Sequence, residues 1–108
     1  MIRIVPHPVF KARVRFTQPG AEDALVDFDF RHKAPAALAD WWAAAAERPV
    51  ADALAEVIVG WSGVIDETGA EVAFCADALA MFLAGHAPRG RELLAAYLRE
   101  MTESRQKN

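Results

Sequence analysis

The sequence predicts an α+β fold, in which an antiparallel β-hairpin at residues 9–17 and 24–32 precedes about four α-helices. Apolar and charged residues alternate near the start of the chain, as in a strand with one buried face. The dipeptide Pro19-Gly20 separates two such alternating runs, which is typical of a hairpin turn. From Pro35 onward the apolar residues recur at helical spacing instead.

The hairpin is expected to have one apolar face and one charged face. The apolar residues of the two runs are Phe10, Ala12, Val14 and Phe16, then Val26, Phe28 and Phe30. The sequence predicts a register that pairs Phe16 with Val26, Val14 with Phe28, and Ala12 with Phe30. On the charged face, the same register pairs Arg15 with Asp27 and Arg13 with Asp29. A slip of one residue would expose the apolar set of one strand.

The first two helices are predicted at residues 35–48 and 50–60, with Pro49 between them. Their apolar stripes are Leu38, Trp41, Trp42 and Ala45, then Leu54, Val57, Ile58 and Trp61. Gly60 and Gly63 break the second helix, and Trp61 closes its stripe as a structural residue. Residues 64–74 contain the turn signal Asp66-Glu67-Thr68-Gly69, so we expect a loop or a minimal hairpin there.

The last two helices are predicted at residues 76–84 and 88–103. Gly85 ends the third helix and Pro88 opens the fourth. The fourth helix carries the longest apolar stripe, formed by Leu93, Leu94, Tyr97, Leu98 and Met101. Residues 102–108 are polar and are expected to fray. With no internal repeat and no long linker, residues 1–108 are expected to form a single domain.

Composition narrows the class of protein. The formal net charge is −3, whereas a nucleic-acid-binding domain of this size is usually basic, so no nucleic-acid partner is expected. The single cysteine cannot form an intrachain disulfide. No segment resembles a signal peptide, and no apolar run is long enough to span a bilayer. We therefore expect a cytoplasmic protein without a membrane partner.

No catalytic, cofactor-binding or metal site is expected from the sequence. His7, His32 and His86 lie on different segments, and no pair has the spacing of metal ligands on one element. Cys75 stands at a predicted helix start, where a reactive thiol is conceivable, but an inert, buried cysteine is the simpler interpretation. Ser62 lacks the glycine spacing of a nucleophile elbow.

The adjacent pair Trp41 and Trp42 is the most unusual local feature. Neighbouring helical residues point about 100° apart, so both rings rarely enter the same core contact. One tryptophan is expected to pack on the sheet and the other to lie at a boundary or an interface. Both could also simply form the rim of the core. The candidate protein-binding residues are Trp41, Trp42, Leu94, Tyr97, Leu98 and Met101.

Four short motifs follow one another between residues 57 and 97, namely Gly60-Trp61-Ser62-Gly63, Asp66-Glu67-Thr68-Gly69, Val72-Ala73-Phe74 and Ala96-Tyr97. Their order resembles that of the tail assembly chaperones of long-tailed bacteriophages and prophages. Residues 27–33, DFDFRHK, also fit one branch of that family. The similarity covers roughly residues 10–97 and consists of structural residues. Cys75 departs from the serine or aspartate that is common before the third helix of the family.

The resemblance implies a non-enzymatic role in virion assembly. Such chaperones bind the long, largely helical tape measure protein during tail morphogenesis, and many of them self-associate. Many also occur in a longer, frameshifted form. The alternative is a small cytoplasmic protein-interaction adaptor or an antitoxin-like module. An enzyme with a site assembled from scattered polar residues has no support in the sequence.

Overall fold

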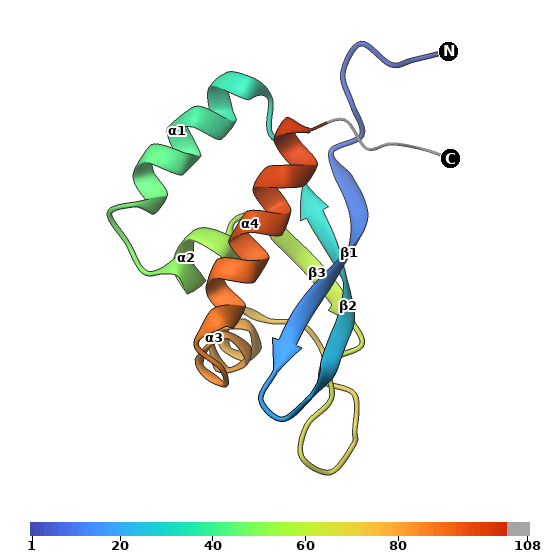
Figure 1. The fold of residues 1–108 in the computed structure, drawn as a ribbon. Coiled ribbons are helices and arrows are strands. Elements are labelled where there is room, and N and C mark those ends of the chain that lie inside the picture. Colours follow the sequence, from blue (N-terminus) through green and yellow to red (C-terminus); the bar gives the residue numbers. More distant parts are fainter. Residues whose placement is uncertain (104–108) are drawn as a thin grey trace.

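The computed structural model describes residues 1–103 of the chain. Its β-hairpin consists of β1 (Val9–Gln18) and β2 (Ala21–Arg31), as Figure 1 shows. Pro19-Gly20 closes the hairpin, and Gly20 adopts the positive φ of 69° that this tight turn requires. The predicted faces are confirmed, because the apolar set from Ala12 to Phe16 is buried together with Val26, Phe28 and Phe30.

The predicted register of the hairpin is wrong by two residues. The structure pairs Phe10 with Phe30, Ala12 with Phe28, Val14 with Val26, and Phe16 with Ala24. The turn is tighter than expected, since Gln18 already pairs with Ala21, and an irregularity between Phe16 and Gln18 sets the final offset. A shift of two residues leaves every side chain on its original face, so the apolar pattern cannot distinguish the two registers.

A third strand, β3 (Ile58–Ser62), replaces the end of the predicted second helix. The helix α2 (Val50–Ala55) ends before it, so the prediction of a helix over residues 50–60 is wrong in its second half. The run Val57-Ile58-Val59 is β-branched, and such residues fit a half-buried sheet better than a helix. Gly60 is part of the strand, at a position where a Cβ would lie 3.0 Å from an Asp29 carboxylate oxygen.

The sheet has the order β1-β2-β3, and its strands are antiparallel. Trp61 lies opposite Phe28 on β2 rather than on a helical stripe. Its ring also packs edge-on against Phe74 and Phe82, and its indole N–H donates to the Val72 carbonyl at 2.8 Å. Trp61 thus connects β3 to the segment that precedes the third helix.

The remaining helices are α1 (Pro35–Ala45), α3 (Ala76–Ala84) and α4 (Pro88–Thr102). The predicted bounds of α3 are confirmed, α4 ends one residue early, and α1 ends three residues earlier than predicted. The predicted polar tail therefore begins within α4 at Thr102, and residues 104–108 of that prediction lie outside the described residues.

The helices cover one face of the sheet, with α4 lying alongside β1 and α1 farther from the sheet (Figure 1). The core centres on Tyr97 of α4, whose ring packs against Phe30 and Trp41 at centroid distances of 5.2 Å. The Tyr97 hydroxyl donates to the Arg31 carbonyl at 2.8 Å, which fixes α4 to the end of β2. The opposite face of the sheet carries charged residues.

Of the two forms expected for residues 64–74, a loop or a minimal hairpin, the structure has the minimal hairpin, with a bridge between Ile65 and Glu71. The Asp66 carboxylate accepts hydrogen bonds from the Thr68 hydroxyl and from the amides of Thr68 and Ala70. These bonds, the one from the Thr68 hydroxyl above all, lower the pKa of the Asp66 carboxyl. The turn is thereby specified by its own side chains.

Candidate functional site

The two adjacent tryptophans of α1 have different environments. Trp41 is only 4% exposed, packs against Tyr97, and donates from its indole N–H to the Ala53 carbonyl of α2 at 3.1 Å. Trp42 is 48% exposed, and its ring centroid lies 6.5 Å from that of Trp41. Trp41 is therefore a core residue, and Trp42 is the tryptophan that a partner can reach.

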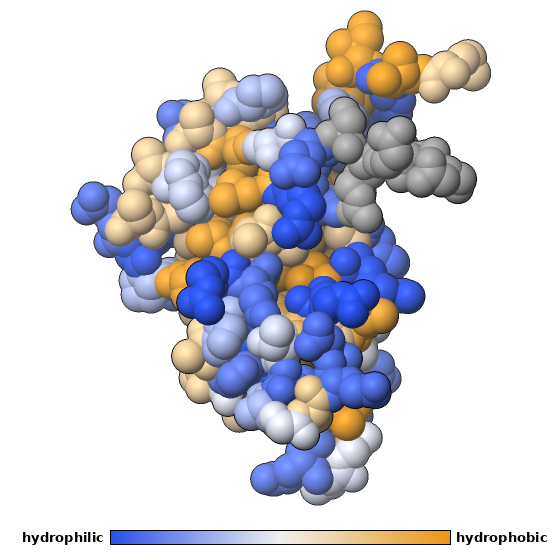
Figure 2. Space-filling model, viewed as in Figure 1, coloured by the Kyte–Doolittle hydropathy of each residue, from blue (hydrophilic) through white to orange (hydrophobic). Residues whose placement is uncertain are grey.

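Trp42 lines a groove of about 570 Å³ between α1 and α4, which we call the apolar groove. Figure 2 shows apolar surface in the region between these two helices. The apolar groove is lined by His32, Lys33, Pro35, Leu38, Ala39, Trp42, Leu98, Met101 and Thr102. Its titratable lining residues, His32 and Lys33, come from the segment between β2 and α1, so the helical walls themselves are largely apolar.

The structure separates the residues that the sequence singles out as candidate protein-binding residues. Leu98 and Met101 lie in the apolar groove with Trp42. Tyr97 is fully buried, and Leu94 is partly buried against the core. Trp41 and Tyr97 can therefore act on a surface only by holding its helices in place.

Sequence reasoning missed the α1 residues that complete the apolar groove. Leu38 and Ala39 lie four and three residues before Trp42, so they share its side of the helix. That spacing was visible in the sequence. The end of α4 that they face was not visible, because the pairing of two helices separated by three other elements depends on the tertiary fold.

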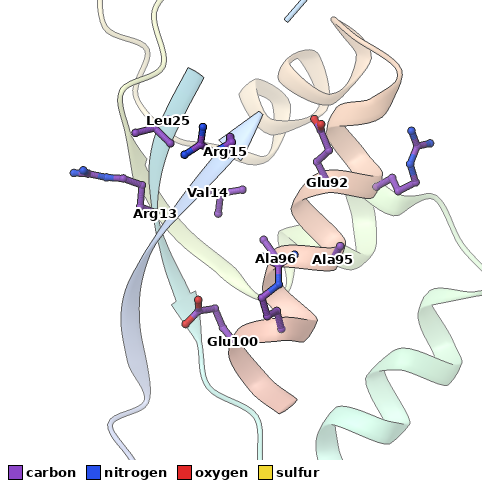
Figure 3. Close-up of a pocket in the computed structure, with 10 residues that line it drawn as sticks. Arg13, Val14, Arg15, Leu25, Glu92, Ala95, Ala96 and Glu100 are labelled. Atoms are coloured by element: carbon purple, nitrogen blue, oxygen red, sulfur yellow. The ribbon is translucent and has the colours of Figure 1, made fainter. Parts of the chain in front are cut away.

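A second groove, of about 790 Å³, lies on the other side of α4, between this helix and β1. We call it the arginine groove, because Arg13 and Arg15 of β1 and Arg91 and Arg99 of α4 line it (Figure 3). Val14, Leu25, Ala95 and Ala96 contribute apolar surface, and Glu92 and Glu100 contribute carboxylates. The alternating sequence predicts only a charged strand face for Arg13 and Arg15.

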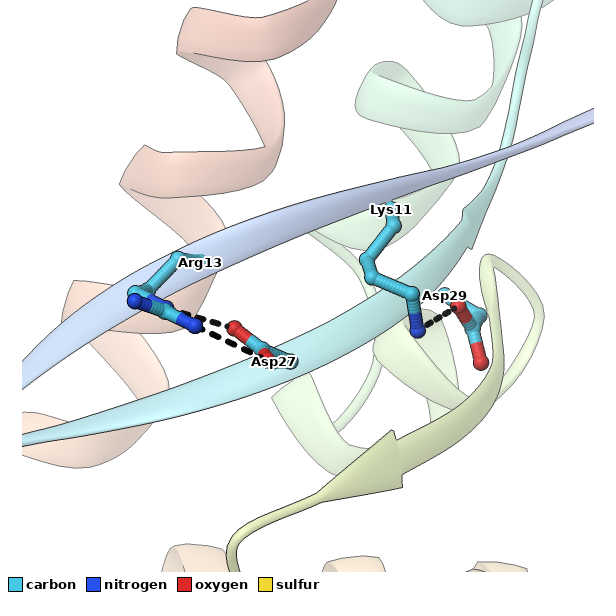
Figure 4. A network of polar contacts seen from close by, with 4 residues as sticks. All are labelled: Lys11, Arg13, Asp27 and Asp29. Carbon is cyan, nitrogen blue, oxygen red and sulfur yellow. Dashed lines mark hydrogen bonds and ion pairs between the residues drawn. The ribbon is translucent and has the colours of Figure 1, made fainter.

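Ion pairs cross the hairpin on the solvated face of the sheet, as Figure 4 shows. Lys11 contacts Asp29 at 3.0 Å and Arg13 contacts Asp27 at 2.8 Å, instead of the predicted pairs Arg13–Asp29 and Arg15–Asp27. The two-residue change of register explains this shift. The hydrogen bond between Arg13 and Asp27 raises the pKa of the guanidinium and lowers the pKa of the carboxyl.

Potential catalytic and metal-binding residues are scattered over the described part of the chain. Cys75 is exposed rather than buried, which corrects the expectation of a small buried hydrophobe. Its sulfur accepts the amide of Ala78 at 3.4 Å and caps α3, the role that a serine or aspartate side chain usually performs. Within residues 1–103, no three histidine, cysteine or acidic residues are grouped as metal ligands would be.

Within the same residues, each helix is too short or too polar to cross a membrane. Comparison with protein families gives a match over residues 1–108 to a family described as phage tail assembly chaperone. No curated protein and no solved structure matches the chain.

Proposed function

The chain belongs to the phage tail assembly chaperone family, and from this premise we propose that it binds the tape measure protein during tail morphogenesis. The role implied by the family is non-enzymatic. The partner is a protein that takes part in building the tail, and the proposed site of action is the cytoplasm of the host bacterium. The apolar groove is the proposed binding surface.

The observation that carries this proposal is the exposure of Trp42 on the wall of the apolar groove. A half-exposed tryptophan is costly to leave in water, and tryptophan is enriched among the residues that dominate binding energy. Leu38, Leu98 and Met101 extend the same surface along both helices. Together they provide a continuous apolar strip rather than one isolated side chain.

A groove between two helices suits an amphipathic helix as its ligand. Such a helix inserts apolar side chains at positions i, i+3, i+4 and i+7 into an apolar groove. The tape measure protein, which the family resemblance describes as long and largely helical, offers such segments. Met101 adds a flexible side chain that can adapt to ligands of different shape.

The same groove offers a route to self-association when no client is present. Monomeric proteins rarely leave a large apolar surface uncovered. A second copy that presents its own α1–α4 surface would cover it. Client and second copy would then compete for Trp42, so homo-oligomers should dissociate as the client binds.

The test is co-expression with the tape measure protein of the same phage. The wild-type chain should raise the soluble yield of that protein and co-purify with it. Trp42→Ala should reduce both, because it removes the main apolar contact while leaving the core intact. Met81→Ala is the matched control, since Met81 is 75% exposed on α3 and does not line the apolar groove.

Two results would overturn the proposal. The wild-type chain could fail both to solubilise and to co-purify with the tape measure protein, and the adaptor hypothesis would then replace it. Alternatively, Trp42→Ala and Met81→Ala could reduce the yield equally, which would place the binding surface elsewhere on the molecule.

A further inference from the structure

The strand β1 lies at an edge of the sheet, and the arginine groove runs along this edge. Among residues 1–103, the strand order β1-β2-β3 gives β1 a single neighbour, β2. The helix α4 flanks β1 but stands off far enough to leave a groove of about 790 Å³, within the roughly 300–1,000 Å³ range of ligand sites. An edge strand beside a helix is the arrangement in which peptides add to a sheet as an extra strand.

The direction of each backbone group on β1 follows from one hydrogen bond just before the strand and from the register of the hairpin. The His32 amide donates to the Pro8 carbonyl at 2.8 Å, which places residues 8 and 32 in a hydrogen-bonded pair. In an antiparallel ladder such pairs alternate, so Phe10, Ala12 and Val14 bond to β2. The amides and carbonyls of the intervening residues Lys11, Arg13 and Arg15 then point to the open edge.

A carboxylate from α4 closes one end of this edge. The Thr17 amide donates to the Glu92 carboxylate, with both oxygens at 3.3 Å. Glu92 thus takes the place of a strand partner at Thr17. The free donors and acceptors of Arg13 and Arg15 lie next to it, in the arginine groove.

The charge of the arginine groove differs from that of the chain. The chain has a formal net charge of −3, yet within residues 1–103 four arginines and two glutamates line this groove. Arg13 already pairs with Asp27, and Arg15 approaches Asp23 only to 4.0 Å. Arg91 and Arg99 are exposed, and neither forms an ion pair within residues 1–103. The groove therefore has cations available for an acidic ligand.

We propose that the arginine groove binds an extended, acidic segment of a partner protein, which adds to the sheet as a strand along the open edge of β1. This site is separate from the apolar groove. Its ligand is acidic and extended, whereas the ligand proposed for the apolar groove is the apolar face of a helix. Figure 3 shows the two walls between which the strand would lie. Backbone hydrogen bonds to Arg13 and Arg15 would hold it, and the arginines would select its charge.

The two sides of an added strand would meet different chemistry. Side chains on the helix-covered face would meet Val14, Ala95 and Ala96, so they should be apolar and small. Alternate side chains would lie on the solvated face near Arg13 and Arg15, so they should be acidic. The expected ligand pattern alternates acidic and apolar residues.

A peptide fits this groove better than a nucleic acid does. The open edge of β1 presents donors and acceptors together, and a peptide backbone complements both, whereas phosphates only accept. Among the residues that the structure describes, no aromatic side chain lines the arginine groove, so this part of the chain offers no stacking platform of the kind on which single-stranded bases usually rest.

The test uses a fluorescein-labelled peptide of about six residues, a usual strand length, in which glutamate alternates with valine. Saturable binding to the wild-type chain at low ionic strength is expected from fluorescence anisotropy. A peptide of identical charge, N-methylated at the residues whose amides face β1, should bind at least about tenfold more weakly, because it loses two or more hydrogen bonds. This control alters only the ligand, so the protein stays wild type in both measurements.

Variants of the protein then locate the site. Arg91→Gln combined with Arg99→Gln removes two positive charges from the helical wall and should weaken binding of the glutamate peptide by about tenfold at low ionic strength, through the field of the groove rather than direct contact. The control is Arg3→Gln combined with Lys33→Gln, which removes the same charge outside the arginine groove and should bind like wild type. Amide hydrogen exchange at Arg13 and Arg15 should slow in the complex, while exchange at Ala12 and Val14 should not change.

Three results would overturn this proposal: no saturable binding, equal binding of the N-methylated peptide, or tighter binding of a single-stranded oligonucleotide than of the glutamate peptide. None of them affects the proposed role of the apolar groove, which is tested through Trp42. Failure of the Trp42 experiment would likewise leave the present proposal intact.

Discussion

The two grooves beside α4 differ in chemistry although one helix forms a wall of each. Toward α1, this helix contributes Leu98 and Met101 to the apolar groove. Toward β1, it contributes Arg91, Ala95 and Arg99 to the arginine groove. These three residues are spaced four apart, so they form a row along one flank of the helix.

The helix α4 therefore has three distinct sides, an inner side and two flanks. Its inner side, with Leu93 and Tyr97, is fully buried and holds the helix on the sheet. The two flanks border the core without entering it. The flank that faces α1 contributes apolar residues, as α1 does, and the flank that faces β1 carries arginines, as β1 does. If α4 is divided only into a buried face and a solvent face, neither groove is recognised.

The largest expected effect comes from the inner side, on which both grooves depend. Tyr97→Ala removes a fully buried ring that packs on Phe30 and Trp41, and should lower the free energy of unfolding by about 3–5 kcal/mol. Urea denaturation followed by circular dichroism measures this change. A loss below about 1 kcal/mol, the size typical of surface substitutions, would show that α4 is not seated through Tyr97.

The elements of the fold differ in how far the sequence could predict them. Alternation gave the two faces of the hairpin correctly, Gly85 marked the end of α3, and Pro88 marked the start of α4. The prediction of the register was wrong because strand faces repeat every two residues. Only the turn and the irregularity after Phe16 decide between registers that differ by two residues. The strand β3 was not predicted because Leu54, Val57, Ile58 and Trp61 also fit helical spacing. Only its pairing with β2 selects the strand.

The candidate site was predictable to a similar extent. Two adjacent helical tryptophans cannot share one direction, which indicated that one of them would lie outside the core, and Trp42 does. The arginine groove was not predictable from the row Lys11, Arg13 and Arg15. That row looks the same on an open solvated sheet as beside a helix, and only the packing of α4 on β1 makes it part of a groove.

A smaller effect on the inner side is expected from Tyr97→Phe, which keeps the ring and removes the hydroxyl. The Arg31 carbonyl loses its 2.8 Å hydrogen bond, and the free energy of unfolding should fall by about 1 kcal/mol at neutral pH. Burial raises the pKa of the Tyr97 phenol from 10.0 to about 12. Below pH 10 the phenol is protonated in both the folded and the unfolded chain, and its contribution is complete.

Between these two pKa values the unfolded chain releases the proton first, so the wild-type protein loses stability as the pH rises. Tyr97→Phe lacks this titration. The stability difference between the two proteins should therefore shrink from pH 10 to pH 12, as measured by urea denaturation at each pH. A constant difference over this range would contradict the buried, hydrogen-bonded state of the hydroxyl.

A still smaller effect on stability is expected on the apolar flank. Trp42→Ala removes a half-exposed ring, and the free energy of unfolding should change by less than about 1 kcal/mol. Fluorescence of the neutral dye Nile red, which brightens on apolar surfaces, should nevertheless fall in this variant. Met81→Ala, which also removes an exposed apolar side chain, should not lower the dye signal as far. A large loss of stability in Trp42→Ala would place this ring in the core.

Ionic strength should distinguish the two grooves while leaving stability nearly unchanged. Salt shortens the range of electrostatic interactions from about 10 Å at 0.1 M to about 3 Å at 1 M. Binding of the glutamate peptide to the arginine groove should therefore weaken as sodium chloride is added. Contacts in the apolar groove depend on removal of apolar surface from water, which salt does not screen, so Nile red binding should persist.

Arg91→Gln combined with Arg99→Gln should flatten the salt dependence of peptide binding, and Trp42→Ala should leave it as in wild type. If both probes lost affinity in parallel, the two flanks of α4 would not be chemically distinct. If Trp42→Ala altered peptide binding as strongly as the arginine variant, a single surface would serve both ligands.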